Sequence, residues 1–199
     1  HRDLHSFLTR RSSDLDLYPE LRRHAVEHAL KLDNANRGGY AVGGLAVGEP
    51  TEKMYEMLDI TCPLLPENKP RYLMGVGTPA NILEGIARGI DMFDCVMPTR
   101  NGRNGMLFTW NGIMNMRNAK WADDFTALDP EGASFVDSYY TRAYLHHLFI
   151  AKEMFAAMVA TEHNLAFYLD LVRNARAHIL AGDFAAWKNA TVPKLMQRL

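Results

Sequence analysis

The chain has 199 residues, of which 48% are hydrophobic, and its formal net charge is -1 at pH 7. Such a chain can bury a core, which excludes a wholly disordered tail, and its near-zero charge excludes a generally basic nucleic-acid coat. No apolar run is long enough to span a membrane, and Cys62 and Cys95 lie in apolar segments without paired spacing. We therefore expect a soluble, cytoplasmic protein with reduced thiols and no membrane partner.

The first residues, 1–15, are polar and rich in Arg and Ser, and they follow neither hydrophobic period. They resemble translated sequencing-adapter sequence, so we expect them to be foreign to the protein and its upstream half to be missing. A disordered native arm is the alternative interpretation.

From Leu17 onward, apolar helices and strands alternate along the chain. The pattern predicts helices over 17–32, 51–65 and 79–90 and strands over 39–47, 71–76 and 92–97. Thr78 and Pro79 supply an N-cap and a first-turn proline for the third helix. Apolar strands separated by helices are typical of a parallel sheet covered on both faces.

Three strands do not close a barrel. The α/β pattern therefore indicates either an open doubly wound sheet or the C-terminal part of a (β/α)8 TIM barrel, and the missing start favours the barrel. Beyond Pro98, Asn111-Gly112 predicts a two-residue hairpin. An irregular segment is then expected over 121–138, followed by helices over 139–160, 164–180 and 183–198.

Asp94 lies within the predicted strand MFDCVM, near its carboxyl end. A carboxylate in an apolar strand is costly to bury without a partner, and catalytic groups of barrels gather at the carboxyl ends of strands. The position therefore suits a nucleophile or base. The alternative is a structural aspartate that faces the helix layer and pairs with an arginine.

The sequence around Asp94 favours chemistry on a polyanion. The stretch after it carries four cations and no acidic residue before Asp123; these cations are Arg100, Arg103, Arg117 and Lys120. The loop PTRNGRNG (98–105) and the glycine-ended strands GGLAVGEP (43–50) and MGVGTP (74–79) let backbone groups approach a ligand closely. A solvated basic loop and ordinary glycine turns are the alternatives.

Together these strings resemble the tRNA-guanine transglycosylases, also called queuine tRNA-ribosyltransferases, of the bacterial type. The resemblance runs from Leu17 to Leu199 and rests on GYAVGGLAVGEP, RYLMGVGTPANILEGIARGIDMFDCVMPTRNGRNG, MRNAKW, RAYLHHL and TEHNLAFY. It implies that the three strands are the sixth to eighth of the barrel. It also implies 16–110 as barrel, 111–165 as an inserted small subdomain, and 166–199 as C-terminal helices completing the barrel.

The resemblance implies that Asp94 is the nucleophile that attacks C1′ of guanosine 34 in GUN-anticodon tRNAs. Guanine leaves, and a deazaguanine then displaces the ribosyl-aspartyl ester, as in a retaining glycosidase. The general acid/base and the base-reading side chains would lie upstream of this chain. By itself the fragment is therefore expected to be inactive.

Further site residues follow from the same resemblance. It implies that the backbone of Gly44 and Leu45 contacts the base and that Met74 packs on its face. Glu49 would be a carboxylate beneath the substrate pocket that orients a peptide group. The resemblance also implies contacts to the tRNA anticodon loop from Gly75, Val76, Gly77, Thr78, Pro79, Ala80 and Asn81 and from Thr99, Arg100, Asn101, Gly102 and Arg103. Ala46-Val47 resembles the bacterial pattern, which implies 7-aminomethyl-7-deazaguanine as the acceptor base in queuosine biosynthesis.

The chain departs from the family at its zinc site. Where relatives carry three cysteines, this sequence has Gly132, Ser134 and Asp137, while the histidine remains as His163. Because these residues cannot build a thiolate site, we expect no zinc and no other cofactor, with His163 as a helix-start or hydrogen-bonding residue. Apolar packing of four aromatic residues would hold the subdomain instead, namely Phe135, Tyr139, Tyr140 and Tyr144.

His146-His147 resembles part of the family's dimer surface and implies a homodimer, although ordinary helix-surface histidines would look the same. Two other functions stay open. One is a non-catalytic tRNA-binding partner subunit of a transglycosylase, against which the presence of Asp94 counts. The other is an unrelated barrel enzyme that binds a sugar phosphate, which would not require MRNAKW or RAYLHHL.

Overall fold

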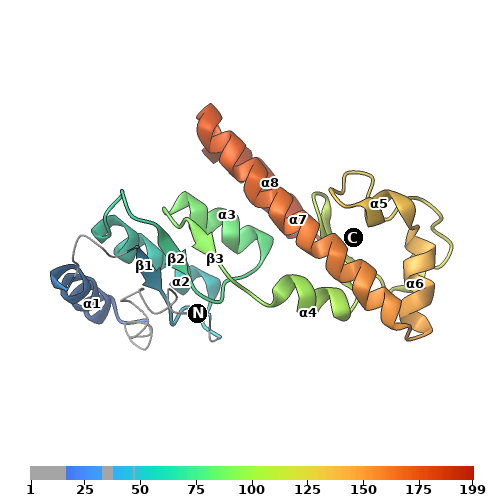
Figure 1. The fold of residues 1–199 in the computed structure, drawn as a ribbon, viewed down its shortest axis with the longest axis horizontal. Coiled ribbons are helices and arrows are strands. Elements are labelled where there is room, and N and C mark those ends of the chain that lie inside the picture. Colours follow the sequence, from blue (N-terminus) through green and yellow to red (C-terminus); the bar gives the residue numbers. More distant parts are fainter. Residues whose placement is uncertain (1–16, 33–37, 47) are drawn as a thin grey trace. The chain divides into compact units, whose positions relative to one another are not determined.

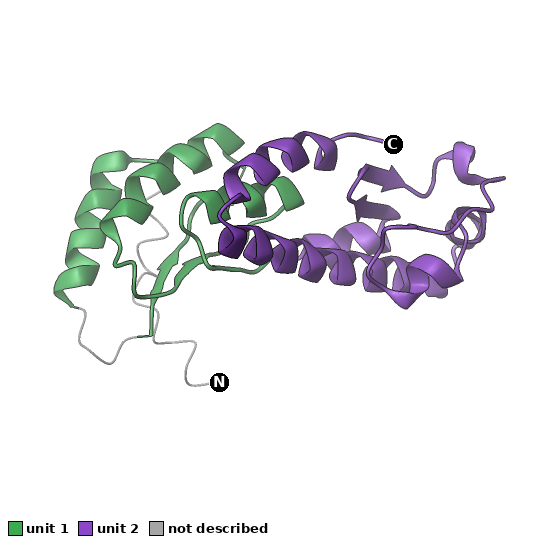
Figure 2. Cartoon of the chain, turned by 90° about the horizontal axis from the view of Figure 1, so that it is seen from above, with its two compact units in different colours: residues 1–95 green, residues 96–199 purple. Residues whose placement is uncertain are grey.

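The computed structural model describes residues 17–32, 38–46 and 48–199. Segment 1–15 and Val47 lie outside the described residues, and so do the expectations that concern them. The chain forms two compact units, residues 1–95 and residues 96–199 (Figure 2). The segment that begins at Val96 packs within the second unit.

The first unit alternates helices and strands, as the sequence predicts (Figure 1). Its elements are α1 (Pro19–Lys31), β1 (Tyr40–Val42), α2 (Thr51–Thr61), the 3-10 turn η3 (Cys62–Leu64), β2 (Arg71–Leu73), α3 (Pro79–Ala87) and β3 (Met92–Phe93). The strands are parallel in the order β1-β2-β3, with Val42 opposite Leu73 and Leu73 opposite Phe93. Their carboxyl ends therefore lie at one edge of the sheet.

All three strands are shorter than expected. Backbone with positive φ at Gly44 (69°) and Gly75 (74°) turns the chain out of the extended conformation soon after β1 and β2. The third strand ends at Phe93, because Met97 already begins a helix with Pro98 in its first turn. Asp94 consequently follows β3, which corrects its expected place inside a strand.

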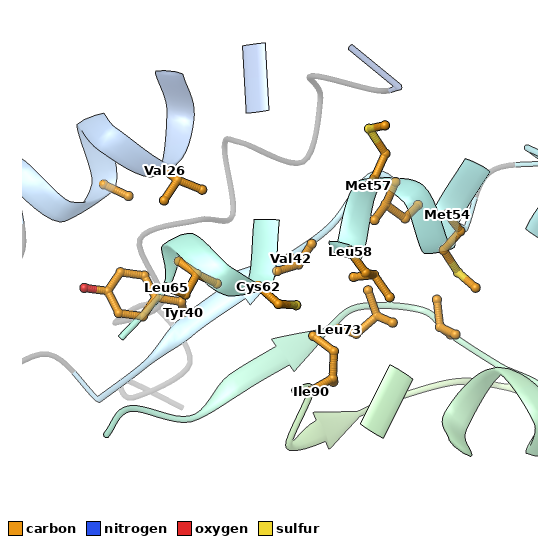
Figure 3. Packing of buried hydrophobic residues seen from close by; sticks show 13 residues of the cluster. Val26, Tyr40, Val42, Met54, Met57, Leu58, Cys62, Leu65, Leu73 and Ile90 are labelled. Atoms are coloured by element: carbon orange, nitrogen blue, oxygen red, sulfur yellow. The ribbon is translucent and has the colours of Figure 1, made fainter. Parts of the chain in front are cut away.

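The core of the first unit lies on one face of its sheet. Tyr40, Val42 and Leu73 pack with Met57 and Leu58 of α2, and Val26 of α1 belongs to the same cluster (Figure 3). Helix α3 reaches this face through Gly85, where an added Cβ would lie 2.8 Å from the ring of Phe93. In the described part of the unit, α1 and α2 pack on this face, and α3 approaches it at Gly85.

The second unit contains α4 (Met97–Arg103), β4 (Met106–Thr109), β5 (Gly112–Asn115), the 3-10 turn η4 (Ala119–Trp121), α5 (Phe135–Tyr139), α6 (Arg142–Ile150), α7 (Met154–Ala181) and α8 (Phe184–Leu195). The expected hairpin is confirmed. Thr109 pairs with Gly112, so the two loop residues are Trp110 and Asn111, and Gly112 opens the second strand with φ of 135°.

Two helical predictions in this unit are wrong. The expected helix over 139–160 is interrupted at residues 151–153, where Lys152 has φ of 60°, and α7 runs without a break through residues 160–164. The expected cationic loop is largely α4, whose Gly102 lies against the backbone of α7; a Cβ there would be 2.9 Å from the carbonyl oxygen of Ala160. Close helix packing explains the glycine, where the sequence alone indicated a loop.

Helix α7 organises the second unit through buried polar side chains. Asn164 is fully buried; its Nδ2 donates to the carbonyl oxygens of Pro98 (2.9 Å) and Met106 (3.0 Å), and its Oδ1 accepts from the amide of Phe108 (3.0 Å). One side chain thus joins α4, β4 and α7. No helix in the described ranges is long and apolar enough to cross a membrane.

The expected aromatic packing of the subdomain is found around Tyr140, whose ring contacts the rings of Tyr139 and Tyr144. Phe135, Tyr139 and Tyr144 are exposed, and only Tyr140 packs against the core. That core consists mainly of aliphatic side chains, together with Trp121 and Phe149; its members include Leu107, Met114, Met116, Leu128, Val136, Leu145 and Leu148.

Candidate active site

Asp94 stands at the carboxyl edge of the parallel sheet, one residue after β3, with an exposed side chain. Its Oδ1 accepts one hydrogen bond from the hydroxyl of Tyr72 (2.6 Å) and one from the backbone amide of Gly75 (2.9 Å). No arginine or lysine in the described ranges forms an ion pair with it. The structural alternative of an Asp-Arg pair is therefore absent from this part of the chain.

Two features of β2 position this carboxylate. Side chains alternate along a strand, so Tyr72 points away from the helix-covered face that its neighbour Leu73 occupies. Directly after the strand, Gly75 has φ of 74°, a conformation that glycine adopts readily and that presents its amide to Asp94. The Tyr72 hydroxyl, from β2, and the Gly75 amide, from the turn after it, thus hold the same oxygen of Asp94.

The second oxygen of Asp94 is left available. Among the residues that the structure describes, Oδ2 has no hydrogen-bond donor. Hydrogen bonds to a charged carboxylate are strong and orienting, so Oδ1 fixes the direction in which Oδ2 points. An oriented, accessible carboxylate oxygen at the end of a parallel strand suits nucleophilic attack on an electrophilic carbon.

The predicted base-binding residues flank this edge. Gly44 follows β1, Met74 follows β2, and the amide of Met74 donates to the carbonyl oxygen of Val42 (2.9 Å). The Leu45 side chain is buried in the core, so only its backbone can face a ligand. Glu49 is half-buried between β1 and α2.

The first predicted tRNA segment, 75–81, is the turn from β2 into α3. Thr78 caps α3, as the sequence predicts, and its Oγ1 accepts from the amide of Asn81 (3.1 Å). Pro79 and Ala80 are buried, whereas Gly75 is exposed and Thr78 and Asn81 are half-buried. The accessible part of this segment is thus its backbone at the start of the helix, together with two polar side chains.

The second predicted segment, 99–103, belongs to the other unit and forms most of α4. Arg100 and Arg103 are exposed there, while Thr99 and Asn101 are half-buried. Gly102 is buried against α7, so packing accounts for this glycine without any contact to RNA.

The residues at the family's zinc positions do not fit a tetrahedral thiolate site. Gly132 has no ligand atom, and the Ser134 hydroxyl lies 3.3 Å from a carboxylate oxygen of Glu162. Both ring nitrogens of His163 are already occupied, one by Asp137 and one by the Phe108 carbonyl. His163 is a hydrogen-bonding residue, as expected, but it lies within α7 and not at a helix start.

Sequence reasoning missed two residues of these sites. Tyr72 is hidden in an apolar strand, and only its alternation with Leu73 hinted that it faces away from the core. Asn164 gave no signal, because its three partners are backbone atoms more than fifty residues away in the chain.

Comparison with known proteins decides the family. A family model described as Queuine tRNA-ribosyltransferase matches residues 16–197. The chain belongs to the queuine tRNA-ribosyltransferase family. Curated proteins named queuine tRNA-ribosyltransferase are similar to it across most of its length.

Three of these relatives illustrate the match. The one from Aquifex aeolicus is 47% identical over 182 residues, covering 92% of this chain and 48% of the relative. The relatives from Tolumonas auensis and Agrobacterium fabrum are 53% and 52% identical, covering 90% and 87% of this chain and 49% and 46% of the relatives. The chain thus spans about half the length of the curated relatives it matches.

Proposed function

We propose that this chain carries the nucleophile of a tRNA-guanine transglycosylase, which exchanges guanine 34 of GUN-anticodon tRNAs in queuosine biosynthesis. The observation that carries the proposal is the Asp94 carboxylate, held through Oδ1 by Tyr72 and Gly75 with Oδ2 available. Membership of the queuine tRNA-ribosyltransferase family supports the substrate.

The proposed reaction has two displacements. Oδ2 of Asp94 attacks C1′ of the ribose as the bond from C1′ to N9 breaks, and guanine leaves with the electron pair and takes up a proton. The nitrogen of the incoming deazaguanine then attacks C1′, the bond to Oδ2 breaks, and the carboxylate is regenerated. We assign the proton transfers to the part of the relatives that this chain does not match.

The position of the described helices supports a barrel over an open sheet. A doubly wound sheet carries helices on both faces, whereas a (β/α)8 barrel carries them only outside. With α1, α2 and α3 on one face, β1, β2 and β3 suit three successive strands of a barrel wall, which we propose to be the sixth to eighth. Asp94 and Tyr72 then face the mouth, where barrel enzymes place their chemistry.

Each unit offers groups that suit RNA: the turn into α3 in the first unit and α4 in the second. The first-turn amides of α3, capped by Thr78, favour a phosphate because the amino end of a helix is partly positive. Arg100 and Arg103 offer exposed guanidinium groups for further phosphates. Extrusion of the base from its stack would bring C1′ to the carboxylate.

We propose 7-aminomethyl-7-deazaguanine as the acceptor base, on the bacterial pattern at Ala46-Val47. The test offers this base and queuine in separate exchange assays. Faster incorporation of 7-aminomethyl-7-deazaguanine is the expected result, and a preference for queuine would contradict the assignment.

We also propose a homodimer through the subdomain. A shallow groove on its surface is lined by Phe135, Tyr140, Phe155 and Met158, beside exposed Tyr139. His147 is exposed, whereas the Nδ1 of His146 lies 2.7 Å from the carbonyl oxygen of Met116 within the subdomain. Sedimentation of the wild type and of Tyr139→Ser/Met158→Ser tests this, and a monomeric wild type would contradict it.

Reduced Cys62 and Cys95 accord with the cytoplasm as the proposed location.

Activity is best tested on a chimera in which residues 17–199 replace the matching segment of the Aquifex aeolicus relative. A covalent adduct between protein and tRNA should be trapped with wild-type sequence and with Asp123→Asn, an exposed control carboxylate. Asp94→Asn should lose the adduct and keep tRNA binding, because an amide is not a nucleophile here. If the adduct persists in Asp94→Asn, the assigned nucleophile is wrong, and if no variant forms it, the non-catalytic partner is favoured.

A further inference from the structure

Two ionisable side chains form a buried pair in the second unit. Asp137 of α5 and His163 of α7 have side-chain exposures of 1% and 0%, and Asp137 Oδ1 lies 2.5 Å from His163 Nδ1. They are separated by 26 residues in the chain. The pair therefore joins two helices that only tertiary structure brings together.

The other carboxylate oxygen and the other ring nitrogen of the pair also have hydrogen-bond partners. Asp137 Oδ2 accepts from the amide of Ser134 (2.8 Å), and His163 Nε2 lies 2.8 Å from the carbonyl oxygen of Phe108. A carbonyl oxygen only accepts, so Nε2 carries a proton and donates it. Through these bonds the pair fastens the start of α5 and the strand β4 to α7.

Gly132 is coupled to the same carboxylate. A Cβ at this position would lie 2.6 Å from the Cβ of Asp137 and would overlap its carboxyl group. The amide of Gly132 donates to the carbonyl oxygen of Asp129 (3.0 Å), which fixes the turn in front of α5. The observed placement of the Asp137 side chain thus requires glycine at position 132.

These are the positions at which the family resemblance places zinc ligands. We infer that Gly132, Ser134, Asp137 and His163 form a metal-independent lock, in which a buried carboxylate-imidazole pair performs the cross-linking that zinc would perform. The three replacements form one set, because the glycine makes room for the carboxylate and the amide of Ser134 satisfies its second oxygen. The subdomain is therefore expected to fold and stay folded without metal.

The first test measures thermal unfolding of the full 199-residue chain with and without EDTA. Asp137→Ala leaves a buried histidine without its partner and should lower Tm by about 10 °C or more. The matched control is Asp183→Ala, which removes the partly exposed His178-Asp183 pair (2.7 Å) and should change Tm far less. EDTA should not change the Tm of the wild type, and elemental analysis of the wild type should show no stoichiometric zinc.

A conservative variant separates hydrogen bonding from charge. In Asp137→Asn the amide nitrogen can donate to Nδ1 of the neutral imidazole and the amide oxygen can accept from Ser134, so this variant should retain most of the Tm lost in Asp137→Ala. Hydrogen exchange gives a local readout: the amide of Ser134 should lose protection in Asp137→Ala and keep it in Asp137→Asn.

The second test restores the thiolates. Gly132→Cys alone should lower Tm through the steric overlap, whereas Gly132→Cys/Ser134→Cys/Asp137→Cys should bind one Co²⁺ or Zn²⁺ and gain Tm from it. Tetrahedral cobalt-thiolate absorption reports the binding. Four results would each overturn the lock. Two concern the wild type: stoichiometric bound zinc, or a Tm that falls with EDTA. The others are equal Tm losses in Asp137→Ala and Asp183→Ala, or a triple variant that binds no metal.

Discussion

At the candidate site, the Asp94 carboxylate has one oxygen held by hydrogen bonds and one oxygen that is available to a ligand. Asp94 uses one carboxylate oxygen for Tyr72 and Gly75, and the other points away from them. The pattern of apolar and polar residues predicts neither contact, because Tyr72 is typical of a strand residue. Asp94, the proposed nucleophile, stands out in the sequence, whereas its hydrogen-bond partner Tyr72 does not.

Tyr72→Phe tests this positioning role in the chimera. Removal of a hydroxyl that donates to a carboxylate should lower kcat roughly ten- to hundredfold, since such bonds contribute about 1.5–3 kcal/mol. KM for tRNA should change little, because the proposed role of Tyr72 is to orient Asp94 and not to bind RNA. Tyr18→Phe, at an exposed tyrosine, is the control; a rise in KM with unchanged kcat would argue against positioning.

Among the elements, α4 differs most from its expectation. Glycine, asparagine and arginine after a strand indicate a loop, yet residues 97–103 are helical because Gly102 lets the segment approach α7 and Asn164 binds the carbonyl oxygen of Pro98. The same glycine that sequence reasoning assigned to RNA contact therefore has a packing role. Periodicity cannot reveal a helix this short, since seven residues complete barely two turns.

Gly102→Val tests the contact between α4 and α7. The added side chain would overlap the backbone of Ala160, so the free energy of unfolding should fall by about 1–3 kcal/mol. Gly38→Val is the matched control, because a Cβ there meets nothing within 4 Å. Chemical denaturation of the 199-residue chain compares the two; equal stability of both variants would show that the contact does not constrain the packing.

For the whole molecule, buried ionisable groups predict how stability responds to pH. Burial raises the pKa of Cys62 from 9.0 to about 11, against a lowering by Arg71, and burial with Glu84 nearby raises the pKa of Tyr55 from 10.0 to about 12. The folded chain therefore keeps protons that the unfolded chain has lost. Stability falls as pH rises from about 9 to 12.

Cys62→Ala/Tyr55→Phe should flatten this alkaline decline. The variant removes both groups that titrate differently in the folded and unfolded chains, so its unfolding free energy should depend less steeply on pH between 9 and 12. Denaturation curves at several pH values measure the slope, which is independent of any constant loss from the smaller side chain. An unchanged slope would assign the decline to other groups.

The sequence by itself determined the alternation of helices and strands, the hairpin at Asn111 and the family, because hydrophobic periods, caps and long ordered motifs are local signals. Tertiary structure decided which face of the sheet the helices cover, the helical state of α4 and the partners of Asp94. It also paired Asp137 with His163, whereas the sequence showed only that the three cysteines of the family's zinc site are absent. These features depend on atoms tens of residues apart, and no local pattern encodes such distances.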